Sequence, residues 1–184
     1  MRRAVRVAIL MLVVLLALPF IGFGIYDLAA FQSRRTLIEQ IVSAASPDER
    51  NPSPALKRLV QISMHNRTEV FTARILIQDL KIPLITHGML GWHATNALWS
   101  KLVAFHMSEE EQVTLIISRS YMGNSRYGYF AESTSRFGHP LSELSLEELA
   151  TLVAISHAPS LYLSSTERLN ARKEWLIEEY KKGS

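Results

Sequence analysis

The chain has 184 residues, of which 48% are hydrophobic and 20% are charged, and its formal net charge is +3. This composition is typical of one globular domain that carries an additional apolar segment. Part of the positive excess is concentrated in Arg2, Arg3 and Arg6 rather than along one helix face, which argues against a nucleic-acid-binding protein.

Residues that commonly bind metal ions do not occur in a recognisable arrangement. Cysteine is absent, which excludes a disulfide framework, a thiolate nucleophile and a thiolate zinc site. Histidine occurs at positions 65, 87, 93, 106, 139 and 157, but no two of these have the spacing of a His-Glu-x-x-His motif. We therefore predict no metal site and no cofactor.

An uncharged apolar segment runs from Val7 to Ile25. Its nineteen residues would extend about 28 Å as a helix, close to the hydrocarbon thickness of a bilayer. Three arginines precede the segment, and Tyr26 and Asp27 follow it, so the positive-inside rule places the N-terminus in the cytoplasm. We expect residues 1–30 to form a basic cytoplasmic end and a single anchor in the inner membrane, with the remaining chain in the periplasm.

A cleaved signal peptide is the alternative interpretation of this segment, because Ala29 and Ala30 are small enough for a cleavage site. However, the apolar run is longer than the usual 7 to 15 residues, and Leu28 would occupy the minus-three position. These two features favour an uncleaved anchor.

Helical periodicity predicts the next elements. Residues 36–45 place apolar side chains on one face, and the Pro-rich stretch 46–54 interrupts this helix. Ser53 is a suitable N-cap for a new helix with Pro54 at its first position, continuing to Met64. We expect residues 31–52 to form a linker with a short helix, and residues 53–184 to form the folded domain.

Further helices are predicted in the second half of the chain. A helical face covers residues 98–106, and the pairs Ser108 with Glu111 and Ser145 with Glu148 form capping boxes that begin two more helices. The second of these should end before Pro159, and a last helix should begin near residue 165. Residues 121–130 are rich in turn-forming residues, and no long alternating run indicates a sheet. The sequence therefore predicts a mainly α fold: an N-terminal transmembrane helix followed by one compact helical domain.

A recognisable pattern without gaps extends over residues 121–162. Its residues are Tyr121, Gly123, Asn124, Tyr127, Gly128, Phe137, Gly138, Leu144, Leu149, Ala158, Pro159 and Tyr162. On these residues the stretch resembles the C-terminal half of glycosyltransferase family 51, the peptidoglycan glycosyltransferase domain of class A penicillin-binding proteins and of monofunctional biosynthetic transglycosylases. In the last predicted helix, Arg168, Arg172 and Lys173 occur where the family has its final arginine motif. The resemblance implies a lysozyme-like α-helical domain that needs no cofactor.

Residues 53–68 are similar to the family stretch that carries the catalytic glutamate, but the acidic residues are absent. Met64 occurs at the position of that glutamate, and His65 at that of the neighbouring aspartate. Asn96 occupies the position of the second family glutamate. The lysine and asparagine of a later motif become Glu109 and Ser118. The resemblance thus extends over the scaffold and not over the acids of the catalytic motifs.

The family joins one lipid-linked disaccharide to another and releases a polyprenyl pyrophosphate, a reaction that needs a base for the attacking hydroxyl and cations for the pyrophosphate. Met64 cannot accept a proton. We therefore expect a pseudoenzyme without polymerase activity, which acts as a binding or accessory factor in bacterial cell-wall biogenesis. The partners that the resemblance implies are the membrane, the lipid-linked disaccharide or polyprenyl pyrophosphate, and other cell-wall synthesis proteins, with no nucleic acid.

Two alternatives stay open. In the first, the chain is a divergent active glycosyltransferase, for which His65 and Glu109 are the candidate replacements for the missing carboxylates. In the second, it is a structural membrane protein that docks a partner and has no affinity for the lipid-linked sugar. Candidate substrate-binding residues are Lys57, Arg58, Ser118 and Asn124.

Overall fold

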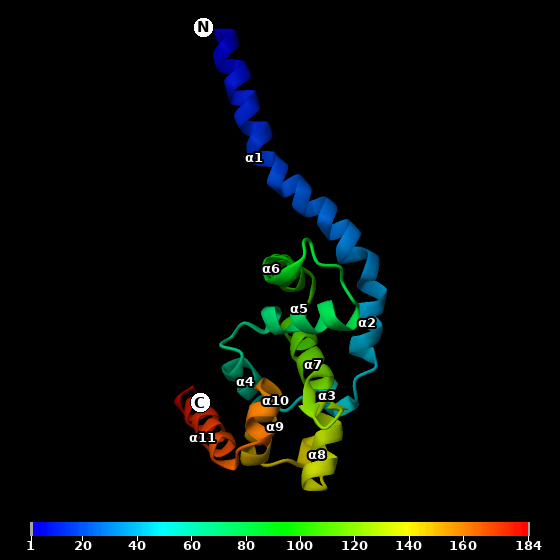
Figure 1. Ribbon diagram of the computed structural model, residues 1–184, viewed down its shortest axis with the longest axis vertical. Helices are drawn as coiled ribbons and strands as arrows, with labels where there is room; N and C mark the ends of the chain where they lie inside the picture. The colour runs from blue at the N-terminus through cyan, green and yellow to red at the C-terminus, as the bar shows by residue number, and fades with distance from the viewer. Residues whose placement is uncertain (1, 184) are drawn as a thin grey trace. The chain divides into compact units, whose positions relative to one another are not determined.

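The computed structural model describes residues 2–183, with side chains for residue 6 and residues 10–183. The chain divides between Glu39 and Gln40 into two compact units, and nearly all regular structure in both is helical (Figure 1). The mainly α fold class is therefore confirmed.

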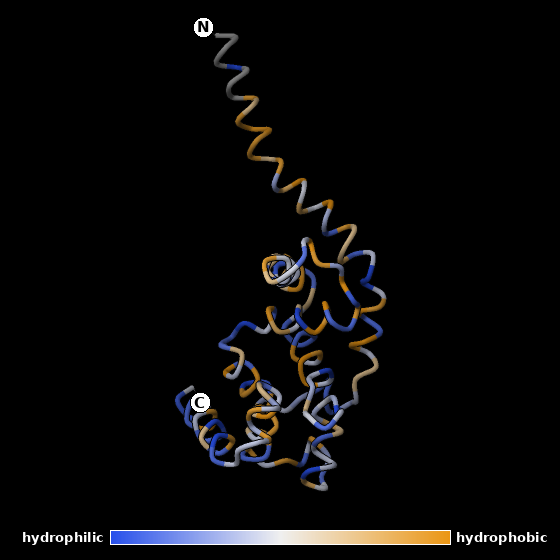
Figure 2. Tube along the Cα trace, in the orientation of Figure 1, coloured by the Kyte–Doolittle hydropathy of each residue, from blue (hydrophilic) through white to orange (hydrophobic). Residues whose placement is uncertain are grey.

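The N-terminal unit contains helix α1, Arg2–Ala30, and the short 3₁₀ helix η1, Gln32–Arg34. Leu10, Leu16 and Phe20 of α1 are among many large apolar side chains that are more than half exposed. Figure 2 shows the same apolar character along this helix. Among the described residues, the stretch beginning in α1 is the one helical segment with the length and hydropathy needed to cross a membrane. An exposed apolar surface of this kind needs lipid or another apolar partner to cover it.

The Pro-rich stretch 46–54, which overlaps the linker predicted over residues 31–52, contains a helix that periodicity did not indicate. After α2, Arg35–Ser43, the one-turn helix α3 spans Pro47–Arg50. Ser46 and Glu49 form a reciprocal capping box that holds this turn, and the Glu49 carboxylate also accepts a hydrogen bond from the backbone N–H of Phe130 at 3.1 Å. The prolines therefore end α2 but do not prevent a further helical turn.

Helix α4, Pro54–Ser63, begins as predicted, with the Ser53 hydroxyl accepting a hydrogen bond from the Leu56 N–H at 3.2 Å. Three helices follow: α5, Thr68–Asp79, α6, Gly88–His106, and α7, Glu109–Arg119. The capping box of Ser108 and Glu111 at the start of α7 is confirmed. Helix α5 was not predicted, because its apolar residues cover more than one face and its N-cap, Arg67, makes no capping bond with its side chain.

The turn-rich segment forms a small antiparallel hairpin of β1, Tyr121–Gly123, and β2, Arg126–Tyr127. The expectation that no sheet forms was therefore wrong at this place, because strands of two and three residues are too short to show alternation. The predicted turn residues Gly123, Asn124 and Gly128 all have positive φ, between 51° and 88°. Helix α8, Tyr129–Phe137, follows directly.

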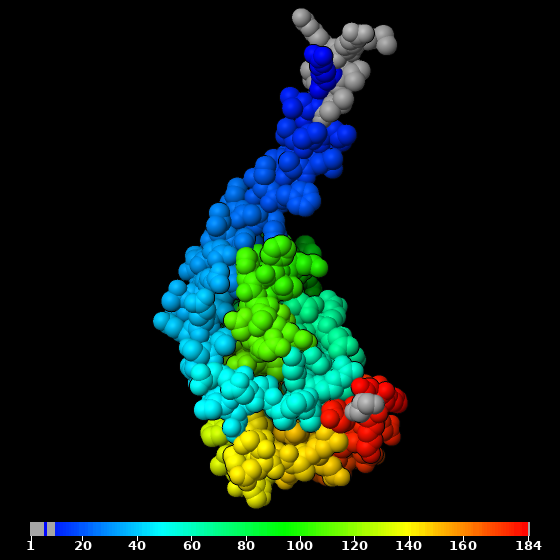
Figure 3. Space-filling view, turned by 180° about the vertical axis from the view of Figure 1, so that it is seen from behind, coloured from blue at the N-terminus to red at the C-terminus, as the bar shows by residue number. Residues whose placement is uncertain are grey.

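The chain ends in η2, Leu141–Glu143, α9, Leu146–His157, α10, Pro159–Leu163, and α11, Thr166–Lys182. Helix α9 is the centre of the hydrophobic core, where it packs on α4 and α11. In the space-filling view of Figure 3, the red surface of α11 adjoins the orange surface of the residues that precede it. Leu152, Val153 and Ile155 are completely buried there. Each such side chain stabilises the fold by roughly 1.5–3 kcal/mol, so α9 fixes the ends of the helices that surround the site.

Candidate functional site

A cleft of about 630 Å³ lies where the ends of several elements of the C-terminal unit meet. One wall comes from Met64 at the end of α4 and from α5, and the other from the end of α7, the hairpin and the end of α9. The lining residues are Met64, Phe71, Arg74, Ile75, Gln78, Asp79, Ile116, Arg119, Ser120, Tyr121, Tyr127, Ser156 and His157. A cleft thus exists between the stretch that resembles the catalytic motif and the turn-rich segment.

Met64 is part of the hydrophobic core and only 3% exposed. It is the C-cap residue of α4, and the chain turns directly after it. The N–H of Asn66 donates to the carbonyl of Gln61 at 2.8 Å, and that of His65 to the carbonyl of Ile62 at 3.0 Å. These two bonds form a Schellman motif, with His65 at the position where helices usually carry glycine. The cleft wall at residue 64 is therefore a thioether, which cannot act as a general base.

The charged side chains of the cleft are mostly cationic. Arg119 on α7 forms an ion pair with Asp79 on α5, with 2.7 Å between Nε and Oδ2. Arg74 lies with its guanidinium carbon 5.1 Å from the centroid of the Phe71 ring. The imidazole of His157, at the end of α9, also lines the cleft. Asp79 is the only carboxylate among the lining residues, and because it is paired, the cleft keeps an excess of positive charge.

His157 has a distinct environment. Its ring centroid lies 6.3 Å from that of Phe71. Desolvation of the ring, and after it the positive charges of Arg172, His65 and Arg74, lower the pKa of His157 below the ordinary value for histidine. Each of these causes disfavours the imidazolium form. His157 is therefore mainly neutral at neutral pH.

Arg172 connects this region to the last helix. Its Nη2 donates to the Ser63 hydroxyl at 3.2 Å, and its guanidinium carbon lies 4.2 Å from the centroid of the Trp175 ring. The Nε of Arg172 is buried and has no hydrogen-bond partner among the described residues. The family-like position of this arginine thus places a cation directly behind the residue that precedes Met64.

Asn96, which the sequence resemblance aligns with the second family glutamate, does not line this cleft. It is buried on α6, where its carbonyl accepts a hydrogen bond from the Ser100 hydroxyl at 2.7 Å, and it lines a second pocket of about 390 Å³. That pocket also carries Arg67, Lys101 and Arg74. Arg74 lines both spaces, so the same arginine borders the cleft of Met64 and the pocket of Asn96.

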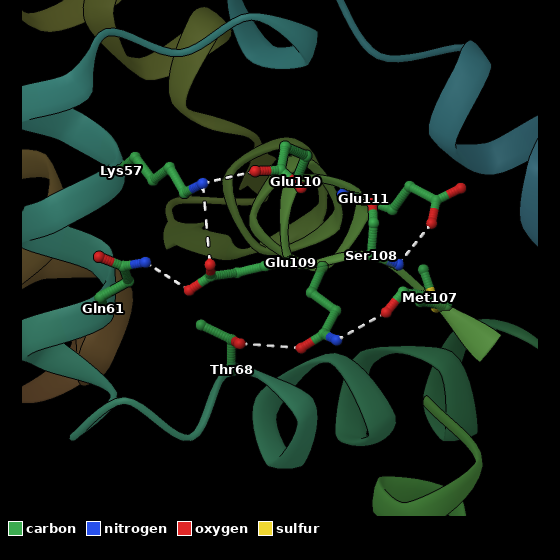
Figure 4. A network of polar contacts seen from close by, with 9 residues as sticks. Lys57, Gln61, Thr68, Met107, Ser108, Glu109, Glu110 and Glu111 are labelled. Carbon is green, nitrogen blue, oxygen red and sulfur yellow. Dashed lines mark hydrogen bonds and ion pairs between the residues drawn. The ribbon is translucent and has the colours of Figure 1, made fainter. Parts of the chain in front are cut away.

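The candidates Lys57 and Glu109 belong to a polar network between α4 and α7 (Figure 4). Lys57 Nζ lies 2.6 Å from an oxygen of Glu110 and 3.8 Å from one of Glu109, and Gln61 donates to Glu109 as well. The hydrogen bond between Lys57 and Glu110 raises the pKa of the lysine and lowers that of the glutamate. Neither Lys57 nor Glu109 lines the cleft, and their charges are used to hold α4 against α7.

The remaining candidates lie in different places. His65 is exposed on the turn after α4, with its ring centroid 6.4 Å from that of Trp175. Arg58 approaches the backbone of Gly183 at the end of α11. The hydroxyl of Ser118 is buried without a hydrogen-bond partner in the described structure, and Asn124 lines a separate hollow of about 320 Å³ at the hairpin. None of these four is among the residues that line the cleft.

The residues that do line the cleft on α5 were not identified from the sequence. Phe71, Arg74, Ile75 and Gln78 have the spacing i, i+3, i+4 and i+7, which places them on one helix face. This signal becomes readable once a helix is assumed over residues 68–79. No group of three or more His, Asp or Glu side chains suited to a metal ion occurs within the described residues.

Comparisons with known proteins match part of the chain. A family model described as Transglycosylase covers residues 86–181, slightly more than half of the sequence. The chain is 32% identical to penicillin-binding protein 1A of Pseudomonas aeruginosa over 74 residues, which are 39% of this chain and 9% of that protein. It is 33% identical to penicillin-binding protein 2a of Streptococcus pneumoniae over 73 residues, or 39% and 10% of the two chains. The match thus spans only about a tenth of the length of these relatives.

Proposed function

Because this chain belongs to the transglycosylase family, we propose that it binds lipid-linked peptidoglycan precursors at the inner membrane without polymerising them, as an accessory factor of cell-wall biogenesis. The observation that carries this proposal is Met64, a buried thioether in the cleft wall where the family has its catalytic carboxylate.

The missing base bears directly on the chemistry. Joining two sugars requires removal of a proton from the attacking hydroxyl, and loss of a positioned general base slows such reactions by roughly 10²- to 10⁴-fold. The only carboxylate that lines the cleft, Asp79, is already paired with Arg119 at 2.7 Å. Because the Arg119 guanidinium already engages this carboxylate, Asp79 is a poor replacement for the missing base.

The cations support binding. Arg74 and Arg119 line the cleft, and the positive charge of Arg172 acts on His157 in the cleft wall. Guanidinium groups bind phosphate oxygens through charge-assisted hydrogen bonds, often two at once. The negative charge of a pyrophosphate group therefore complements the positive charge of this cleft. In the proposed complex, this pyrophosphate belongs to the lipid-linked ligand.

The chain would present this cleft outside the cytoplasm. In the proposed arrangement, residues 1–30 form the cytoplasmic end and anchor, residues 31–52 the linker, and residues 53–184 the binding domain. The three N-terminal arginines support a cytoplasmic N-terminus. A cysteine introduced at the exposed Ser164 and labelled with a membrane-impermeant thiol reagent in intact cells would test this orientation; labelling only after cell lysis would contradict it.

The test of the function uses the full chain in detergent with labelled lipid-linked disaccharide. We expect a thermal shift on addition of the precursor and no glycan strands, while a class A penicillin-binding protein forms strands under the same conditions. Glycan strands made by the wild-type chain would overturn the assignment as an inactive protein. If the strands disappeared in His65→Ala, the divergent enzyme would be the correct description.

A structural role without ligand gives a third result. If neither the precursor nor the polymerisation inhibitor moenomycin shifts the thermal midpoint, the chain only docks a partner. The double variant Met64→Glu with Asn96→Glu adds a further measurement, since strand formation by this variant alone would demonstrate that the scaffold is intact and that the two replaced acids account for its inactivity.

A further inference from the structure

His157 lies on the cleft wall, and basic side chains from three other elements act on its ring. Arg74 lies on α5, His65 on the turn after α4 and Arg172 on α11, and all three act electrostatically on the imidazole. Phe71 covers part of the ring, with centroids 6.3 Å apart. No carboxylate contributes to this environment.

The other ionisable groups near the cleft do not supply a counter-charge. Asp79 is engaged by Arg119, and Tyr121 and Tyr127 are phenols on the hairpin. Tyr129 on α8 hydrogen-bonds to Ser156, next to His157, and Tyr162 on α10 acts on Arg172. The site thus has several cations and no unpaired acid among the described lining residues.

From this arrangement we propose that a phosphate-type anion in the cleft binds together with a proton on His157, so that acidification tightens the binding of pyrophosphate-bearing ligands. The proposal deepens the proposed function and rests on it for the identity of the natural ligand. It adds a regulation by pH to the binding of that ligand.

The physical reason is reciprocal linkage. A bound anion supplies the negative charge that His157 lacks and so favours the imidazolium form. By the same free energy, a proton on His157 favours the anion. In the free protein, desolvation and the neighbouring cations hold the pKa of His157 below its ordinary value of about 6.5. The ring therefore stays neutral at neutral pH. The gain in affinity develops as the pH falls through the raised pKa of His157 in the complex, and it levels off below the lowered pKa of the free protein.

The experiment measures the dissociation constant of inorganic pyrophosphate for the full chain in detergent between pH 7.5 and pH 5.5. Wild type is compared with His157→Gln and with a matched control, His139→Gln. The exposed ring of His139 lies 4.0 Å from Glu143, acts electrostatically on Glu148 and does not line the cleft. Pyrophosphate itself takes up protons in this range, and the comparison with the variants removes that contribution. Between pH 7.5 and pH 5.5, we expect the affinity of wild type and of His139→Gln for pyrophosphate to increase about fivefold more than the affinity of His157→Gln. This factor is at the low end of the usual range for coupling between two binding events.

A second measurement keeps the test independent of how the variant folds. Histidine-selective isotope labelling gives the titration of each imidazole by NMR, and the resonance missing in His157→Gln identifies residue 157. Its pKa should rise when pyrophosphate is added to wild type. An unchanged pKa, or the same pH dependence of binding in wild type and His157→Gln, would refute the linkage while leaving the proposed binding intact. Absence of binding both of pyrophosphate and of the lipid-linked precursor would refute the proposed function as well.

Discussion

Arg119 and Asp79 form an ion pair inside the cleft, with 2.7 Å between Nε of the arginine and Oδ2 of the aspartate. The pair joins α5 to the end of α7 and neutralises the only acid that lines the cleft. Both side chains are partly exposed, so the pair adds only about 0–1 kcal/mol to stability. Its larger effect is on the charge that a ligand meets.

Replacement of Asp79 by asparagine releases the Arg119 guanidinium and makes the cleft more positive. We expect Asp79→Asn to bind inorganic pyrophosphate several-fold more tightly, by about 0.5–1 kcal/mol, because one repulsive charge is removed close to the anion. Titration calorimetry of the full chain measures this. Glu179→Gln is the matched control, since it removes the same charge from an exposed pair with Lys182 on α11. An equal gain in both variants would assign the effect to net charge rather than to the cleft.

Met64 stabilises the core as an apolar side chain. Met64→Leu conserves volume and should cost less than about 1.5 kcal/mol, whereas Met64→Ala leaves a cavity and should cost about 2–4 kcal/mol. Urea unfolding followed by tryptophan fluorescence measures the difference. Met89→Ala serves as control, because that side chain is 76% exposed and should change stability little. If Met64→Ala were as stable as Met64→Leu, residue 64 would not be packed as the structure has it.

Tyr129 should remain protonated in the folded chain well into alkaline solution. Its side chain is fully buried, its hydroxyl lies 2.5 Å from the Ser156 hydroxyl, and burial raises the pKa of the phenol far above its ordinary value. The unfolded chain loses this proton from about pH 10, so it binds fewer protons than the folded chain above that pH, and stability falls as pH rises further.

Absorbance at alkaline pH tests this prediction. One tyrosine should ionise only together with unfolding, as seen by circular dichroism, and this coupled step should be absent in Tyr129→Phe. A phenol count that is complete before the helical signal is lost would contradict the prediction.

Glu132 is a buried carboxylate held by two arginines. Arg126 Nε and Arg136 Nη2 approach its two oxygens at 2.7 and 2.8 Å, and the glutamate side chain has no exposed surface. Glu132→Gln leaves both cations without their counter-charge. Because the arginines are partly exposed, we expect a loss of about 1–3 kcal/mol rather than the full value for a buried pair.

Thermal unfolding provides the measurement for this variant. Glu147→Gln is the control, since Glu147 is largely exposed and lies 4.0 Å from Lys173. Equal midpoints for the two variants would mean that the pair with Arg126 does not fasten the hairpin to α8.

The parts of the fold that the sequence predicted depend on neighbours a few residues away. The caps at Ser53, Ser108 and Ser145 each require one backbone bond three residues along the chain, and all three form. The positive φ of Gly128 was predictable from the residue type alone, because glycine adopts this conformation without a steric penalty.

The cleft depends instead on residues far apart in the chain. Arg74, Arg119 and His157 meet because α5 packs on α7, α4 packs on α9, and side chains of these helices share one hydrophobic core. No short motif in the sequence contains more than one of the three residues. The sequence resemblance singled out Met64 and Asn96 as the replaced acids, but it could not show that Asn96 lines a different pocket from Met64. The positions of basic residues along the chain do not indicate which of them line one cleft, because this depends on how the helices pack.

The Schellman turn after Met64 has an experimental use. His65 has φ 53°, a backbone conformation that costs a residue with a Cβ about 1–2 kcal/mol and costs glycine almost nothing. His65→Gly therefore deletes the imidazole and relaxes the backbone in the same step. At most positions a histidine cannot be removed without some doubt about folding, whereas here the deletion should raise the melting temperature. A loss of function in this variant, together with a raised melting temperature, would consequently not be due to unfolding.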